Sequence, residues 1–195
     1  MNDLLINKTL HFIQNNMNYS NEDMIKVKYG LEGVYLTISK MLIIILIGFI
    51  FHYLDIILLT LLFFNFLRFF AFGLHAKKSI HCLILSILNF NVLPFIMMHI
   101  TIHSYIVITM FLFAFFSFLL FSPSDTVKRP LTNKRKRIIR KIVSILVLIL
   151  LFIIVHYFPF LKVPILCASF IESIMINPIS YHILGLPYGN YQKKA

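Results

Sequence analysis

The sequence has little of what a water-soluble or secreted domain needs. Charged residues make up 13% of its 195 residues, whereas soluble domains contain about 25%. Hydrophobic residues reach 59%, so the polar surface is too small to cover a globule, and disorder is excluded. Only two cysteines, Cys82 and Cys167, are present, which excludes a disulfide-stapled secreted fold. The mean hydropathy of +0.88 indicates an integral membrane protein.

Acidic residues are also scarce. Seven Asp and Glu residues stand against 18 Lys and Arg residues, which gives a net charge of +11. In a soluble protein this excess would suggest nucleic acid as a partner. In a membrane protein it marks cytoplasmic segments and contact with anionic lipid headgroups, so we expect no nucleic acid partner.

Six apolar stretches approach the length of about 20 helical residues that crosses a bilayer core. They are Met41–Tyr53, Ile56–Phe70, Ile80–Met98, Tyr105–Phe121, Ile142–Phe158 and Pro164–Leu186. The first is short, so we expect it to begin before Lys40. In this arrangement all but one of the 18 Lys and Arg residues lie on one side, and only Lys162 lies on the other. The positive-inside rule then predicts that both termini are cytoplasmic.

These stretches predict an all-α polytopic membrane protein with about six transmembrane helices, preceded by amphipathic helices. Residues 1–40 carry apolar side chains at helical spacing among polar ones, so we expect an interfacial segment there. Residues 41–195 form the predicted transmembrane domain, with a basic cytoplasmic loop at 122–141.

Several motifs of known chemistry are absent. The chain has no phosphate-binding glycine loop, no His-Glu-x-x-His sequence and no Cys-x-x-Cys pair, so we expect neither a metal nor a cofactor. Glu172 is one of few carboxylates within the apolar stretches, so the chain has few of the intramembrane groups that an ion-coupled transporter needs. The densest set of reactive side chains lies in the segment Arg68–Cys82, which contains a glycine, two histidines and a cysteine.

Cys82 is a candidate nucleophile and His75 its candidate base. A straight helix would separate two residues seven positions apart by ~10 Å along its axis, which is too far for proton transfer. The pair therefore requires a bend, which Gly73 permits. Cys82 would then lie in the first turn of a span, where the helix dipole favours a thiolate. The alternative is that Cys82 is a small buried apolar residue and His75 an interfacial one. His81 ranks second as the base, since it points about 100° away from Cys82 on a helix.

The segments Lys28–Gly30, Arg68–Cys82 and Ser122–Leu131 resemble, in this order along the chain, three stretches of the accessory gene regulator B family of bacterial membrane peptidases. The resemblance extends over essentially the whole chain. It implies a membrane cysteine endopeptidase that cleaves the C-terminal tail from the short precursor of a cyclic quorum-sensing peptide. It also implies a bacterial cell membrane location and a homodimer.

The resemblance further assigns roles to residues. Cys82 matches the catalytic nucleophile, His75 the general base and acid, and Arg68 and Gly73 two supporting positions. Cys82 would hold the ring segment as a thioester, which a cysteine or serine of the precursor displaces to close a thiolactone or lactone. A third catalytic group is not evident, and Glu32, Asn65 and Asp125 are its candidates.

The basic loop and a phenylalanine group have two interpretations each. The loop is either an anchor on anionic lipid or a binding site for an acidic precursor tail; its candidate tail-binding residues are Lys128, Arg129, Lys134, Arg135, Lys136 and Arg137. Phe69, Phe70 and Phe72 either pack against lipid or core, or keep water from the thioester. The rival functions for the whole chain are a small-peptide exporter subunit and a non-catalytic membrane scaffold.

Overall fold

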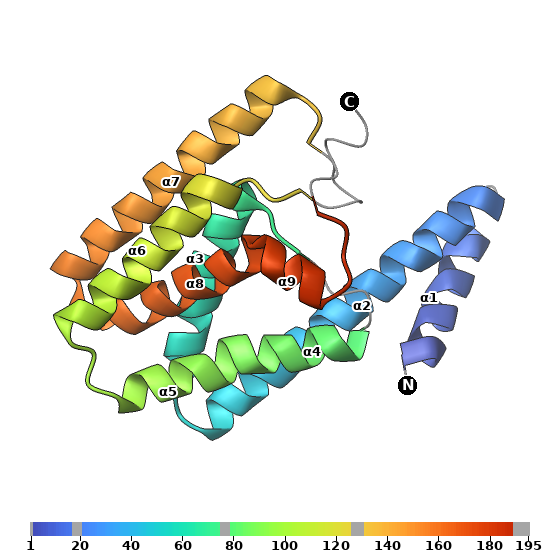
Figure 1. Ribbon diagram of the computed structural model, residues 1–195. Coiled ribbons are helices and arrows are strands. Elements are labelled where there is room, and N and C mark those ends of the chain that lie inside the picture. Colours follow the sequence, from blue (N-terminus) through green and yellow to red (C-terminus); the bar gives the residue numbers. More distant parts are fainter. Residues whose placement is uncertain (1, 17–20, 75–78, 126–130, 189–195) are drawn as a thin grey trace. The chain divides into compact units, whose positions relative to one another are not determined.

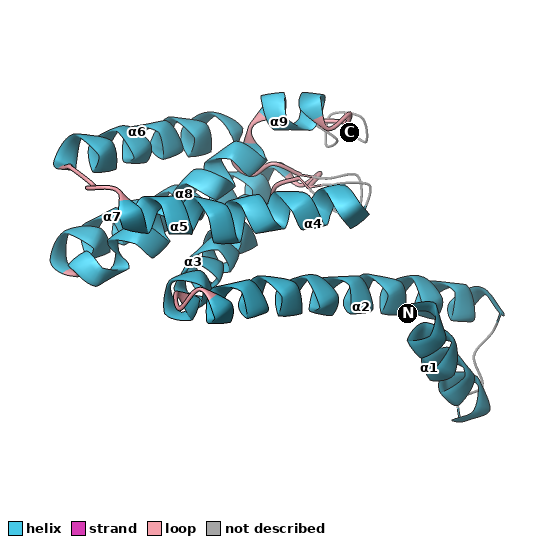
Figure 2. Cartoon of the chain, turned by 90° about the horizontal axis from the view of Figure 1, so that it is seen from below, coloured by secondary structure: helices cyan, strands magenta, loops and turns pink. Residues whose placement is uncertain are grey.

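The computed structural model describes residues 2–16, 21–74, 79–125 and 131–188. In these residues the regular structure is helical, with short loops between the helices (Figures 1 and 2). The elements are α1 (Asn2–Asn16), α2 (Asn21–Ile50), α3 (Leu54–Ala71), α4 (Ser79–Ile87), a π-helical turn (Leu88–Val92), α5 (Leu93–His99), α6 (Ser104–Phe121), α7 (Lys134–Tyr157), a 3₁₀ turn (Pro159–Leu161), α8 (Lys162–Ile176) and α9 (Pro178–Ile183).

Six helical stretches in the described residues are long and apolar enough to cross a membrane. They are Asp23–Ile50, Leu54–Ala71, Cys82–His99, Ser104–Phe121, Lys134–Tyr157 and Pro159–Ile176. The predicted all-α fold with six spans is thus confirmed. The first span does use residues before Lys40, because α2 continues through that residue.

Two segments differ from the sequence prediction. The last span ends at Ile176 instead of Leu186, because Asn177 takes an extended conformation (ψ 133°) before Pro178 and its side chain caps α9. The predicted loop at 122–141 is helical from Lys134 onward, since α7 begins there with Asn133 as its N-cap.

The contacts within the chain divide it into two units, residues 1–46 and 47–195. In the first unit, the hydroxyl groups of Thr9 in α1 and Tyr35 in α2 form a hydrogen bond of 2.9 Å. Lys26 and Asp23 form an exposed ion pair on α2. The division into functional domains at residue 40 stays a prediction.

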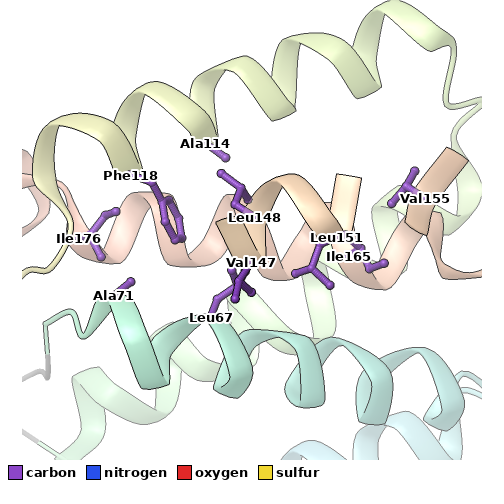
Figure 3. Close-up of a cluster of buried hydrophobic side chains, with 10 residues drawn as sticks. All are labelled: Leu67, Ala71, Ala114, Phe118, Val147, Leu148, Leu151, Val155, Ile165 and Ile176. Atoms are coloured by element: carbon purple, nitrogen blue, oxygen red, sulfur yellow. The ribbon is translucent and has the colours of Figure 1, made fainter. Parts of the chain in front are cut away.

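The core of the second unit forms where α3, α6, α7 and α8 meet (Figure 3). Helix α8 lies at its centre: 56% of the last span is buried, against at most 33% of each other span. Small residues of α8, among them Ala168, Ser169 and Ser173, are buried and allow neighbouring helices to approach closely. The buried apolar cluster consists of Leu67, Ala71, Ala114, Phe118, Val147, Leu148, Leu151, Val155, Ile165 and Ile176.

The third span is interrupted at its middle. Pro94 has no N–H for the carbonyl of Phe90, and the helix widens into the π-helical turn just before it. Asn91 of this turn is buried, and its side-chain oxygen accepts a hydrogen bond of 3.4 Å from the Tyr53 hydroxyl. Pro94 therefore interrupts the third span through a π-helical turn.

Candidate active site

The candidate site begins where α3 ends. Phe72 follows the helix with φ 62° and ψ −140°, and Gly73 has φ 131°. The φ of Gly73 is one that residues with a side chain rarely adopt. A Cβ placed on Gly73 would lie 3.1 Å from Nη1 of Arg68 and 3.4 Å from Oε1 of Glu172. The bend predicted at Gly73 is present, and only glycine fits it without strain.

Backbone hydrogen bonds fix the residues after this bend. The N–H of Gly73 donates to the carbonyl of Ser124 (3.0 Å), and the N–H of Ser124 donates to Ala71 (2.8 Å). Phe72 and Ser124 thereby form an isolated parallel β-bridge. The N–H of Leu74 donates to the carbonyl of Met175 in α8 (3.1 Å). The exit from α3 is therefore held from two directions.

The Arg68 side chain hydrogen-bonds to the carbonyl groups of the same segment. Its Nη2 donates to the carbonyls of Leu74 (2.6 Å) and Gly73 (3.4 Å). Its Nη1 donates to Oε2 of Glu172 (3.3 Å) and to Sδ of Met175 (3.2 Å). The Arg68 side chain is 15% exposed and that of Glu172 is 0% exposed. The supporting residues suggested by the resemblance, Arg68 and Gly73, are thus in direct contact with one another.

The proposed catalytic pair is described only in part. His75 lies outside the described residues, between Leu74 and the start of α4 at Ser79. Cys82 lies in the first turn of α4 and is half-buried; its backbone oxygen accepts a hydrogen bond from the Ser86 hydroxyl (2.7 Å). Cys82 forms no disulfide, and the pairing of His75 with Cys82 stays a prediction.

The three candidates for a third catalytic group lie in different surroundings. Asn65 is exposed on α3 and its amide donates to the carbonyl of Leu61 (2.8 Å). Asp125 is buried, accepts a hydrogen bond from the N–H of Leu131 (3.3 Å) and lies 4.0 Å from Arg137. Glu32 belongs to the unit of residues 1–46. Their catalytic role stays untested.

Sequence reasoning missed the part that Glu172 plays. The sequence alone suggests only an ion-transport role for its carboxylate, yet the carboxylate pairs with Arg68 of another span. The signal was available: an acidic and a basic residue, each inside an apolar stretch, commonly pair with one another because burying either charge alone is costly.

The basic residues around α7 fall into two groups. Lys134, Arg135 and Lys136 are exposed in the first turn of the helix. Arg137 instead donates to the carbonyl of Pro123 (3.1 Å) and lies near Asp125. Lys128 and Arg129, the remaining candidates for tail binding, lie outside the described residues.

The phenylalanines at the end of α3 contact a further basic residue. Nη1 of Arg140 donates to the carbonyl of Phe69 (2.8 Å), and its guanidinium lies 4.5 Å from the ring centre of Phe72. The Phe69 ring is exposed, whereas Phe70 and Phe72 are half-buried. Of the three, Phe72 is the one that adjoins the backbone of Gly73.

The family is decided by comparison with known proteins. A family model described as Accessory gene regulator B matches residues 6–184. The chain belongs to the accessory gene regulator B family. The resemblance found in the three short sequence stretches is therefore confirmed, and the match includes Arg68, Gly73, His75, Cys82 and Glu172.

Individual relatives of this accessory gene regulator B chain agree over most of its length. It is 34% identical to an AgrB-like protein of Clostridium acetobutylicum, covering 87% of this chain and 82% of the relative. It is 34% identical to an AgrB-like protein of Listeria innocua, covering 88% and 85%. It is 29% identical to accessory gene regulator protein B of Staphylococcus aureus, covering 92% and 96%. No solved structure matches the chain.

Family membership supports a role in the accessory gene regulator quorum-sensing system. The six apolar helices make the protein a multi-pass membrane protein.

Proposed function

We propose that this accessory gene regulator B protein is a membrane cysteine endopeptidase that cleaves a short peptide precursor and promotes its cyclisation. The observation that supports this best is the anchoring of Gly73 and Leu74 immediately before His75 in the chain, with Cys82 in the helical turn that follows. A base close to the nucleophile, and a nucleophile at a helix N-terminus, are what thiol-protease chemistry requires.

The first half of the reaction releases the precursor tail. His75 takes the proton from Sγ of Cys82, and the thiolate attacks the carbonyl carbon after the future ring segment. The C–N bond breaks, His75 gives the proton to the leaving amine, and the ring segment stays on Cys82 as a thioester.

The second half closes the ring. A cysteine or serine side chain of the precursor gives its proton to His75 and attacks the thioester carbonyl; the C–S bond to Cys82 breaks, and Cys82 leaves as a thiolate. Exchange between thioesters is close to neutral in energy, so water must be kept away from the intermediate. In the proposal the half-buried Phe70 and Phe72 at the end of α3 exclude this water; Phe72 directly precedes Gly73 in the chain.

The basic residues serve in the proposal as a binding site for an acidic precursor tail. Lys134, Arg135 and Lys136 are exposed at the N-terminus of α7, where the helix dipole adds to their positive charge. Arg137 is partly engaged by Asp125, so we expect it to contribute less. The same residues can attract anionic lipid headgroups; in that alternative they would anchor the protein on the membrane surface and would not bind the precursor tail.

The proposal places both termini in the cytoplasm of a bacterial cell and makes the protein a homodimer. The charge distribution supports the orientation, because the basic residues at 128–141 follow the fourth span and Lys162 follows the fifth. The homodimer rests on the resemblance to the family alone.

Co-expression with the short open reading frame next to its gene tests the proposed function. We expect Cys82→Ala and His75→Ala to abolish cleavage of the encoded peptide and His81→Ala to retain it. Mass spectrometry of the peptide distinguishes the uncleaved, linear and cyclic products. Equal processing by all three variants would contradict the proposal and favour an exporter subunit or a scaffold.

A further inference from the structure

Glu172 is a buried carboxylate to which the proposed mechanism gives no part. It lies in α8, its side chain is 0% exposed, and its Oε2 pairs with Nη1 of Arg68 at 3.3 Å. Its Oε1 has no hydrogen-bond partner among the described residues. The charge is thus buried with only part of its hydrogen-bonding capacity used.

Stability alone does not account for this arrangement. A buried ion pair is often no more stabilising than apolar residues of similar volume, because both charges lose their hydration. Helices α3 and α8, which carry the pair, also contribute Leu67, Ala71 and Ile176 to the buried apolar cluster. The contacts of Arg68 indicate what the pair does instead.

The Arg68 guanidinium connects α8 to the backbone that leaves α3. Nη1 faces Glu172 and Met175 of α8, while Nη2 donates to the carbonyls of Gly73 and Leu74. A guanidinium is planar, so an anchor on Nη1 also sets the direction of Nη2. Glu172 therefore determines where Arg68 holds this backbone.

Gly73 makes the arrangement possible. A side chain at this position would meet both Arg68 and Glu172, with Cβ 3.1 Å from Nη1 and 3.4 Å from Oε1. The Arg68–Glu172 pair therefore occupies space that is open because Gly73 has no Cβ.

We propose that Glu172 is a positioning residue of the peptidase: by orienting Arg68, it fixes the Gly73–Leu74 backbone from which His75 follows. This inference rests on the proposed pairing of His75 with Cys82. Loss of the Glu172 carboxylate would leave Cys82 in place in α4 but remove the activation of its thiol.

Alkylation of Cys82 by iodoacetamide measures this activation without any precursor. The full chain is purified in detergent with Cys167→Ala, so that Cys82 is the only thiol, and the rate is measured from pH 5 to 10. A thiol that a neighbouring base activates reacts about tenfold faster at pH 7 than an ordinary thiol, because more of it is present as the thiolate. We expect Glu172→Gln to lose this advantage and to show the pH profile of His75→Ala.

Two further variants separate positioning from folding. Arg68→Met combined with Glu172→Leu leaves no charge unpaired, so we expect it to keep the thermal unfolding temperature of the parent and still to alkylate like His75→Ala. Ser173→Ala changes the buried residue next to Glu172, whose hydroxyl bonds only to the carbonyl of Phe170 among the described residues, and should alkylate like the parent.

The outcomes distinguish a failure of the inference about Glu172 from a failure of the proposed His75–Cys82 pair. If His75→Ala slows alkylation while Glu172→Gln or the double variant keeps the parental rate and pH profile, Glu172 has no positioning role and the proposed function stands. If His75→Ala itself keeps the parental rate and profile, the His75–Cys82 pair is wrong, and the inference about Glu172 falls with it.

Discussion

Positive charge occurs in two contrasting surroundings near the candidate site. Arg68 is largely buried, faces Glu172 and directs its remaining donors at backbone carbonyls. Lys134, Arg135 and Lys136 are exposed in the first turn of α7. The comparison shows that similar charges differ in their partners: the buried Arg68 hydrogen-bonds to backbone carbonyls, whereas the exposed residues of α7 are accessible to an anion.

The largest effect is expected from removing the buried charge. Arg68→Ala leaves the carboxylate of Glu172 buried without its cation, and breaking a buried pair in this way costs about 3–5 kcal/mol. Thermal unfolding in detergent measures the loss, and precursor processing should disappear with it. A variant as stable as the parent would show that Glu172 is not held as an ion by Arg68.

A side chain at Gly73 tests the buried region without removing a charge. Gly73→Ala places a Cβ 3.1 Å from Arg68 at a φ of 131°, which we expect to cost about 1–3 kcal/mol and most of the processing activity. Gly33→Ala is the matched control, since nothing lies within 4 Å of a Cβ there. Equal loss of processing in both variants would contradict a specific requirement at Gly73.

The exposed region should respond through binding alone. Replacing Lys134, Arg135 and Lys136 together by Gln should raise the KM for an acidic-tailed precursor roughly fivefold, with kcat and unfolding temperature unchanged. The effect should shrink as salt is raised from about 0.05 to 0.5 M. Lys26→Gln, on the exposed side of α2, is the control. An unaltered KM would contradict a role of these residues in tail binding and would favour their anchoring on anionic lipid headgroups.

The smallest effect is expected at the edge of the buried region. Tyr181 donates a hydrogen bond to the carbonyl of Ser124 (3.3 Å), and Tyr181→Phe should lower the free energy of unfolding by about 1 kcal/mol. Burial raises the pKa of Tyr181 to about 12, above its ordinary value near 10. The hydroxyl form is therefore favoured by folding, and this stabilisation is present below pH 10 and lost as the pH rises toward 12.

Unfolding measured from pH 6 to 9 should consequently show a constant difference between Tyr181→Phe and the parent. A difference that changes within this range would mean that Tyr181 ionises well below the expected pH.

The spans could be predicted from the sequence because hydropathy and helix length are local properties. The end of the last span was placed too late, although Asn177 before Pro178 carried the signal for a stop. The bend at Gly73 and the first-turn position of Cys82 were also local and agree with the structure.

The environment of the site could not be predicted in the same way. The bonds from Ser124 to Ala71 and Gly73 join residues about fifty positions apart, and no periodicity reports them. Glu172 lies still further from Arg68 in sequence, and only the packing of α8 against α3 brings them together. Such contacts depend on the tertiary arrangement, which a single sequence does not encode as a pattern.

The parallel bridge between Phe72 and Ser124 has a geometric consequence for the whole site. In a parallel bridge both chains run the same way, so Gly73 and Asp125 depart from the same end of it. One of these chains continues in sequence to His75, and the other to Lys128 and Arg129. The two chain segments that follow Gly73 and Asp125 thus begin at the same end of the bridge. Changing the length of either segment would change how far its residues can extend relative to those of the other.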